Sequence, residues 1–265
     1  MKLFTQIIYE VFCSFYSELV TNLECFFLKF SIKEKNSLEK NGYIKFQKKL
    51  DLSLKKSLSE IVFSKRNKSI YINKYHKRLI LSKENLKKII DTIFDKQFCN
   101  FLSSQTGFKY SIDFFGAYEN FPIPKSEINQ SWYANQYHLD KPNSKNMLKI
   151  FLPISNISIK DGPLELLDIK QTQQYSYSKK SKDVFKKNYF IGDLGDIFLC
   201  KLNLCLHKAG VPDEGRSTKL IMLQLNPSRK WYLNSKLYKR QYFREPKFTS
   251  FVNRFCFRKP LIFES

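Results

Sequence analysis

The part of the chain after about residue 106 most constrains what this sequence can fold into. It holds a series of short apolar runs of strand-like composition, and Gly, Pro, Asn and Asp separate them. No long helical pattern lies between successive runs, although a parallel α/β sheet needs such crossover helices. An antiparallel sandwich or barrel is therefore favoured. The predicted strands cover 109–118, 133–140, 147–154, 163–167, 196–199 and 220–225.

The first hundred residues have helical periodicity instead. Apolar residues recur at helical spacing through residues 1–32 and glutamates interrupt them, so we predict an amphipathic helix and neither a signal peptide nor a transmembrane span. We expect this helix to pack on the protein's own core, with contact to a membrane surface or to a partner helix as alternatives. Residues 50–63 and 84–98 are also predicted to be helical. A turn signal precedes a short predicted strand at 43–46.

Composition narrows the class of protein. Hydrophobic residues make up 43% of the 265 residues, so we expect a sizeable folded core and not a disordered chain. None of the six cysteines forms a C-x-x-C pair, so thiolate zinc sites and dithiol redox motifs have no support. Their spacing suggests no disulfide framework, and we predict reduced, mostly buried thiols in a cytoplasmic protein. The cysteines are Cys13, Cys25, Cys99, Cys200, Cys205 and Cys256.

The net charge of +22 favours anionic partners such as phosphates, nucleic acid, anionic lipid or an acidic protein. The alternative is a solubilising, lysine-rich surface. A basic loop at 179–187 either steers an anionic substrate or is simply solvated. The basic, aromatic segment 229–259 either binds single-stranded nucleic acid, docks on an acidic surface or is a structural tail. No nucleic-acid-binding module is recognisable, so we do not expect a nucleic-acid function. The loop lysines are Lys179, Lys180, Lys182, Lys186 and Lys187.

Two of the three histidines have the surroundings of metal ligands. His138 and Asp140 are two residues apart at the end of a predicted strand, so their side chains point to the same face. His207 follows a second predicted strand and can supply a third ligand. Two imidazoles and one carboxylate form a facial triad that leaves positions open on Fe(II) for a chelating 2-oxo acid and O2. His76 has no carboxylate near it in sequence, and we predict a surface or helix-packing role for it.

Four further residues are candidates for binding the 2-oxo acid. Its distal carboxylate needs a buried cation, and Arg216 offers a bidentate guanidinium shortly after His207. Thr218 lies on the same face of that strand and can add a hydrogen bond. Asn135 lies three residues before His138, and Lys149 is the polar residue of an apolar predicted strand. For Asn135 and Lys149, an exposed or structural role is the alternative.

The chain resembles the phytanoyl-CoA dioxygenase family of Fe(II)- and 2-oxoglutarate-dependent oxygenases. The matching stretches occur in the family's order and span most of residues 41–226. They are Asn41-Gly42-Tyr43-Ile44, Tyr137-His138-Leu139-Asp140, Asp161-Gly162-Pro163-Leu164, Gly195-Asp196-Ile197-Phe198, His207-Lys208-Ala209-Gly210 and Gly215-Arg216-Ser217-Thr218.

The resemblance implies a mainly β fold with flanking helices, whose core is a double-stranded β-helix (a cupin-like jelly roll). It implies His138, Asp140 and His207 as iron ligands and Arg216 as the 2-oxoglutarate anchor. Succinate and CO2 would be the co-products. Because halogenating relatives lack the carboxylate, Asp140 favours hydroxylation. The implied organisation is an N-terminal helix at 1–32, an oxygenase domain at 33–228 with its jelly roll from about 106, and a basic, aromatic extension at 229–265.

Two departures from the family concern mainly the substrate side. Tyr137 stands where the family often has Trp, and the Pro-Gly-Ser-His stretch that usually follows Gly-Pro-Leu is absent. The substrate is therefore predicted only as a small organic or carrier-linked molecule, with an anionic group as one option. The alternatives are a non-catalytic binding protein on the same scaffold and a basic surface-binding protein that acts through its tail.

Overall fold

Two antiparallel sheets form the centre of the molecule. The computed structural model describes residues 2–30, 37–48, 68–81, 83–140, 144–178 and 184–231. Within these ranges the strands are β1 (Tyr43–Gln47), β2 (Lys68–Asn73), β3 (His76–Ile80), β4 (Lys109–Asn120), β5 (Leu148–Pro153), β6 (Glu165–Leu166), β7 (Asn188–Tyr189), β8 (Asp196–Cys200), β9 (His207–Lys208) and β10 (Thr218–Ser228). The helices are α1 (Lys2–Phe27), α2 (Ser37–Asn41), α4 (Lys83–Ile93), α5 (Lys96–Thr106), α6 (Ile169–Ser178) and the 3₁₀ helix η1 (Ile159–Asp161).

The strand order is that of a double-stranded β-helix. The large sheet has the order β1-β8-β5-β10-β4-β3-β2, and the small sheet has the order β7-β6-β9. An antiparallel bridge between His138 and His207 extends the small sheet beyond β9. From β4 onward the chain passes back and forth between the two sheets, apart from the consecutive strands β6 and β7, which pair within the small sheet, as in a jelly roll. The predicted fold class is confirmed.

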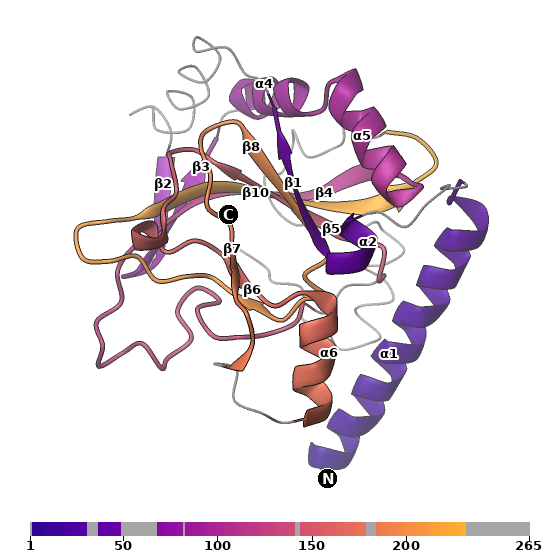
Figure 1. Cartoon of the computed structure of the whole chain (residues 1–265), viewed down its shortest axis with the longest axis horizontal. Coiled ribbons are helices and arrows are strands. Elements are labelled where there is room, and N and C mark those ends of the chain that lie inside the picture. Colours follow the sequence, from indigo (N-terminus) through magenta and orange to yellow (C-terminus); the bar gives the residue numbers. More distant parts are fainter. Residues whose placement is uncertain are drawn as a thin grey trace.

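The central strands of the large sheet are buried on both faces, and alternate residues of β10 belong to different hydrophobic clusters. Ile221, Leu223 and Leu225 belong to a cluster that includes buried residues of α4 and α5. Leu220 belongs to a second cluster, which contains Leu166 of the small sheet. Figure 1 shows α4 and α5 on one side of the large sheet and β6, β7 and α6 on the other. Period-two alternation along the strand thus defines an outer face toward the helices and an inner face toward the small sheet.

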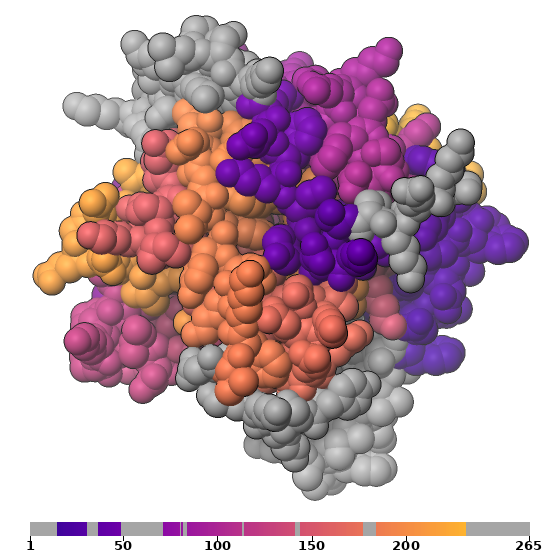
Figure 2. All heavy atoms as spheres, in the orientation of Figure 1, coloured from indigo at the N-terminus to yellow at the C-terminus, as the bar shows by residue number. Residues whose placement is uncertain are grey.

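The predicted strand at 43–46 is confirmed as β1. It forms the edge of the large sheet and pairs with β8, with Tyr43 opposite Cys200. Phe46 lies on the face of β1 that is turned toward the helices. The centroid of its ring is 5.4 Å from that of Phe98 and 4.5 Å from that of Phe101, both in α5. Figure 2 shows this segment (indigo) between the orange segment that contains β8 and the magenta helices. β1 therefore ties α5 to the edge of the large sheet.

The helical periodicity at 84–98 belongs to two helices and not to one. α4 ends at Ile93, and α5 begins after Asp95, whose Oδ1 accepts a hydrogen bond of 2.8 Å from Phe98 N. An aspartate that caps a helix in this way starts a new helix, because its side chain satisfies a backbone N–H that has no partner within the helix. α5 ends at Gly107, which has a φ of 73°.

The predicted N-terminal helix is confirmed as α1, and polar contacts attach one of its faces to the body. Thr21 Oγ1 accepts a hydrogen bond of 2.9 Å from Lys145 N. The Glu24 carboxylate accepts hydrogen bonds from the Ser144 hydroxyl and, at 3.0 Å, from Asn146 Nδ2. Cys25 and Leu28 are partly buried against the hydrophobic cluster that includes the buried residues of α4 and α5, which is called the helix-side core below.

The expectation that the apolar face of α1 packs on the protein's own core is therefore only partly met. Because the contacts above turn the polar face inward, a row of large apolar side chains faces solvent, and Phe26 is 81% exposed. No helix among the described residues is long and apolar enough to cross a membrane. The exposed apolar residues of α1 are Phe15, Leu19, Leu23, Phe26 and Phe27.

Several predicted segments differ from the structure. The strand predicted at 133–140 is reduced to the bridge at His138, and the one at 163–167 to the two residues of β6. His76, predicted on a surface or a helix, lies in β3, where its Nδ1 is 2.7 Å from Asn120 Oδ1. The predicted helix at 50–63 and nearly all of the extension at 229–265 lie outside the described residues.

Candidate metal centre

The three predicted metal ligands converge at the end of the small sheet. Ligand atoms of His138, Asp140 and His207 all lie within 4.8 Å of one another. Asp140 Oδ1 is 3.8 Å from His138 Nε2 and 3.9 Å from His207 Nε2. His207 is buried, whereas 36% of the His138 side chain is exposed. One side of the cluster is therefore closed and the other is open to a ligand.

Strand pairing brings the two histidines together. His138 N donates to His207 O at 2.9 Å, and His207 N donates to His138 O at 3.1 Å. Residues that exchange both bonds lie directly opposite each other, so their side chains are neighbours on one face. The two imidazole centroids are 4.3 Å apart. Asp140 N donates to Leu202 O at 3.1 Å, which fixes the third ligand two residues after the first.

Backbone carbonyls orient both imidazoles. His138 Nδ1 lies 2.8 Å from Gln136 O, and His207 Nδ1 lies 2.9 Å from Cys205 O. A carbonyl only accepts hydrogen bonds, so each Nδ1 carries the proton when the ring is neutral. Each Nε2 then presents a lone pair to the cluster. This is the tautomer in which histidine binds a metal through Nε2.

The electrostatics of the cluster favour the metal-binding protonation states. Burial lowers the pKa of His207 to about 4, although the Asp140 carboxylate acts in the opposite sense. Burial raises the pKa of Asp140, but the positive charge of Lys149 and the neighbouring histidines outweigh burial and hold it below its ordinary value. At neutral pH the cluster therefore has a neutral His207 and an ionised carboxylate.

These residues fit a divalent metal. Asp140 Oδ2 is buried and accepts no well-aligned hydrogen bond, although Lys149 Nζ forms an ion pair with it at 2.7 Å. Two imidazole nitrogens and one carboxylate oxygen are the donor set of non-haem Fe(II) sites with open coordination positions. The same donor set also binds other divalent first-row metals, because several of these ions accept imidazole and carboxylate ligands.

Lys149 lies on the inner face of the large sheet. In β5 it is opposite Gln224 of β10 and Cys200 of β8. Its side chain is 15% exposed and contacts Asp140. Lys149 was a candidate from the sequence, and in the structure it forms an ion pair with the predicted metal ligand Asp140.

Arg216 forms an ion pair with Asp161 and not with Asp140. Its guanidinium is 55% exposed, and Nη1 lies 3.7 Å from Asp161 Oδ1. Thr218 is buried, but its hydroxyl donates to the backbone carbonyls of Asp161 and, at 2.9 Å, Gly162. With its hydrogen bound to the backbone, the Thr218 hydroxyl has no hydrogen to donate to a carboxylate. The structure therefore does not bring these two predicted residues to the metal ligands.

Asn135 has contacts of the structural kind that the sequence left open as the alternative. Its Oδ1 accepts from Trp132 N at 2.7 Å, and its Nδ2 donates to Ile128 O at 3.1 Å and Gln130 O at 2.9 Å. Both amide hydrogens are thus used within the loop that leads to His138. An amide with both donors engaged cannot also donate to a 2-oxo acid.

Polar residues of β3 and β4 line the inner face of the large sheet, and the sequence did not identify them as residues of the site. Arg78 is buried and lies opposite Tyr118, and His76 lies opposite Asn120. Burial raises the pKa of Tyr118, and the nearby Cys200 and Asp140 raise it further, so this hydroxyl lies in the field of the metal cluster. The available signal was the alternating pattern of residues 68–80 around a turn, which indicates a hairpin.

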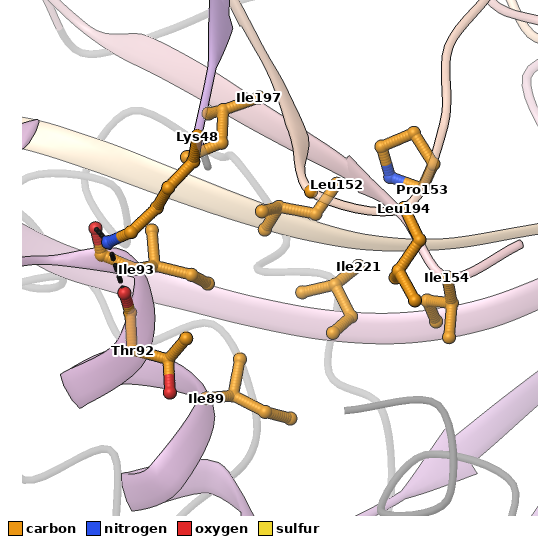
Figure 3. Close-up of a pocket in the computed structure, with 11 residues that line it drawn as sticks. Lys48, Ile89, Thr92, Ile93, Leu152, Pro153, Ile154, Leu194, Ile197 and Ile221 are labelled. Carbon is orange, nitrogen blue, oxygen red and sulfur yellow. Dashed lines mark hydrogen bonds between the residues drawn. The ribbon is translucent and has the colours of Figure 1, made fainter. Parts of the chain in front are cut away.

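A pocket on the other face of the large sheet is not part of this centre. It lies between α4 and the sheet, and its apolar lining belongs to the helix-side core (Figure 3). Lys48 reaches across one end and donates to the carbonyls of Thr92 and, at 3.1 Å, Ile93. Lys48 Nζ also pairs with Asp95 Oδ2 at 2.9 Å. This lysine therefore caps the C-terminus of α4 and braces the start of α5.

Replacing Lys48 with methionine should destabilise the protein by about 2 kcal/mol, the usual cost of losing hydrogen bonds from a charged, largely buried donor. Urea unfolding monitored by circular dichroism measures this loss. Lys88→Met is the matched control, because Lys88 is on α4 but is 59% exposed and pairs only at 3.4 Å with Glu84. An equal loss in both variants would contradict the capping role.

Comparison with solved structures supports the fold assignment. The chain is similar to the non-heme alpha ketoglutarate dependent epimerase SnoN from nogalamycin biosynthesis, with a TM-score of 0.52 and 7% identity over 72% of this chain and 79% of that one. It is also similar to HygX from Streptomyces hygroscopicus with nickel and 2-oxoglutarate bound, with a TM-score of 0.50 and 8% identity over 72% and 85%. Identity this low shows a shared fold. No family model and no curated protein matches the sequence.

Proposed function

We propose that this protein is an Fe(II)- and 2-oxoglutarate-dependent dioxygenase that hydroxylates a small organic or carrier-linked substrate and releases succinate and CO2. The observation that carries the proposal is the cluster of His138, Asp140 and His207 in the jelly roll, where the two Nε2 atoms lie 3.8 and 3.9 Å from Asp140 Oδ1 and each Nδ1 faces a backbone carbonyl. The ordered motifs shared with the phytanoyl-CoA dioxygenase family support the same function.

Each ligand has a defined task in this proposal. His138 and His207 would bind the metal through Nε2, and Asp140 through its carboxylate. Lys149 would keep the Asp140 carboxylate ionised and oriented through its contact with Oδ2. Bound Fe(II) supplies the ability to activate O2 once a 2-oxo acid chelates it. The retained carboxylate of Asp140 is the reason to propose hydroxylation over halogenation.

The cation for the distal carboxylate of 2-oxoglutarate is proposed to be Lys149. It lies on the inner wall and contacts a metal ligand, and an ammonium has three hydrogens with which to serve two carboxylates. Arg216, the anchor that the family resemblance implies, is the second candidate, because its side chain would have to leave Asp161 and turn inward. Thr218 is a candidate only if its hydroxyl leaves the carbonyls of Asp161 and Gly162.

The remaining proposals concern surroundings and partners. We propose a cytoplasmic location, because no disulfide links the described cysteines and three of them are buried. An anionic substrate remains part of the proposal, with Lys186 and Lys187 at the described end of the basic loop. Lys187 already lies 3.6 Å from Glu165, so this lysine is not a purely solvated one.

Anaerobic titration tests the proposed function. Fe(II) and 2-oxoglutarate should together give the visible metal-to-ligand charge-transfer band that marks a 2-oxo acid chelated to iron. His138→Ala should lose the band, because it removes a ligand from the metal. Lys88→Met, on the far side of the large sheet, should keep it. If the folded wild-type protein gives no band and binds no iron, the enzyme proposal fails.

A further inference from the structure

We infer that Tyr137, Glu165 and Lys208 form a strap on the outer face of the small sheet, and that this strap positions His138 against His207 for metal binding. The inference rests on the proposed metal-binding function. None of the three residues is a predicted ligand, and Glu165 did not emerge from the sequence at all. Their role would be to position the ligands and not to touch the metal.

The strap connects three adjacent chain segments. In the small sheet β9 lies between β6 and the segment that carries His138. The Tyr137 hydroxyl donates a hydrogen bond to Glu165 Oε1, so this side chain passes over β9 to reach β6. Lys208 lies beneath it, with Nζ 5.0 Å from the centre of the Tyr137 ring and 3.5 Å from Glu165 Oε2.

The strap and the metal ligands occupy opposite faces of the sheet. Tyr137 directly precedes His138, and Lys208 directly follows His207, so side chains alternate between the two faces. Pairing across the strands agrees with this, because Glu165 is opposite Lys208 whereas Leu166 is opposite His207. A change in the strap therefore acts on the metal through the backbone of the two ligand residues.

The His138 segment needs such support because little backbone structure holds it. It joins the small sheet through an isolated bridge and not through a full strand. Two backbone hydrogen bonds tie His138 to His207, and one on either side joins Ala209 N to Ala134 O at 2.8 Å and Asp140 N to Leu202 O at 3.1 Å. A segment held by so few bonds can shift, and a small shift would change the separation between the two Nε2 atoms. The strap adds a side-chain link at the residue next to the ligand.

A single buried carboxylate holds the strap together. Glu165 is only 7% exposed, and it faces Lys208 and Lys187 together with the Tyr137 hydroxyl. Replacing it with glutamine keeps the shape but removes the negative charge between two lysines. The ammonium groups then repel each other, and the phenol loses a charged acceptor. Removing the Tyr137 hydroxyl should have a related effect, because it cuts the same link.

The test measures metal affinity and local opening of the full chain in Tyr137→Phe, Glu165→Gln and the double variant. Co(II) is the probe, because its visible spectrum reports coordination geometry and it does not oxidise during the titration. Asp196→Asn is the matched control: it breaks a lysine–carboxylate pair of 2.6 Å in the large sheet, with a carboxylate side chain about as buried. Hydrogen exchange of the segment 134–140 in the metal-free protein is a second, independent measurement.

We expect each single variant to bind Co(II) about 10- to 100-fold more weakly, as is typical when support for metal-bound histidines is lost. The fold loss of Co(II) affinity in the double variant should be smaller than the product of the two single-variant losses, because both changes cut the same link. Exchange of segment 134–140 should increase in both. Asp196→Asn should alter neither quantity, even if it lowers the melting temperature.

Unchanged Co(II) affinity in the folded Tyr137→Phe and Glu165→Gln proteins would overturn the strap's role in metal binding, whatever the exchange at 134–140 shows. The two proposals also fail in different ways. If wild-type protein binds no Co(II), the metal-binding function itself is wrong, and the strap's role in metal binding falls with it. If wild type binds Co(II) and the strap variants bind it equally well, only the strap is wrong.

Discussion

Replacing Asp140 with alanine should abolish tight metal binding and destabilise the metal-free protein at the same time. The loss of affinity should exceed the roughly 100-fold effect of losing a supporting residue, because a direct ligand is removed. The loss of stability should be about 3 kcal/mol, because Lys149 keeps its charge in a largely buried position without its partner. Co(II) titration and urea unfolding measure the two effects separately.

The double variant Asp140→Ala/Lys149→Met separates the two causes. Removing both charges takes away the unpaired ammonium, and an apolar replacement of a buried ion pair is often close to neutral. Stability should therefore return to near the wild-type value, whereas metal affinity should stay as low as in Asp140→Ala. If the double variant regained Co(II) binding, the carboxylate would not be a ligand, and the assignment of Asp140 would be wrong.

The fold was predictable where one strand carries enough residues to show its period. β4 and β10 are 12 and 11 residues long, and both were located in the sequence because their apolar residues face two cores. The small sheet is different. β6 lies within the strand predicted at 163–167, but β6 and β9 have two residues each, so periodicity could not define their bounds. Their position follows from tertiary contacts, such as the pairing of Leu166 with His207.

The candidate site was predictable in its chemistry and not in its support. Histidine and aspartate two residues apart are weak evidence alone, but together with His207 they predicted a facial triad, and the structure brings all three predicted ligands together. The groups that surround them come from distant parts of the chain. Arg78 precedes His138 by 60 residues in sequence, and Glu165 bonds to Tyr137 across 28. Such pairings depend on strand register, which local sequence patterns do not specify.

Arg216 illustrates the same limit from the other side. Its residue type and its spacing from His207 favoured a role with the 2-oxo acid, but the neighbouring Asp161 offers a competing carboxylate. Asn135 is similar, because an amide in a loop has local backbone groups to bond. Short-range partners of this kind take up polar side chains that would otherwise reach a ligand.

Replacing Lys149 with methionine should remove the ability to distinguish 2-oxoglutarate from 2-oxovalerate, which has a methyl group where 2-oxoglutarate has its distal carboxylate. Both acids chelate iron through the same 2-oxo carboxylate, so the ratio of their dissociation constants isolates the distal group. Wild-type protein should prefer 2-oxoglutarate by about 10- to 100-fold, the worth of a charge-assisted hydrogen bond of roughly 1.5–3 kcal/mol. The ratio should fall toward one in the variant.

Using a ratio protects this experiment from the contact between Lys149 and Asp140. Losing Lys149 also disturbs a metal ligand, which weakens the binding of both acids alike and cancels when they are compared. Arg216→Met is the parallel variant, and it should keep the wild-type ratio because its guanidinium faces Asp161 and solvent. The reverse pattern, with discrimination lost in Arg216→Met and kept in Lys149→Met, would assign the anchor to Arg216. That result would mean that the arginine turns into the barrel when the 2-oxo acid binds.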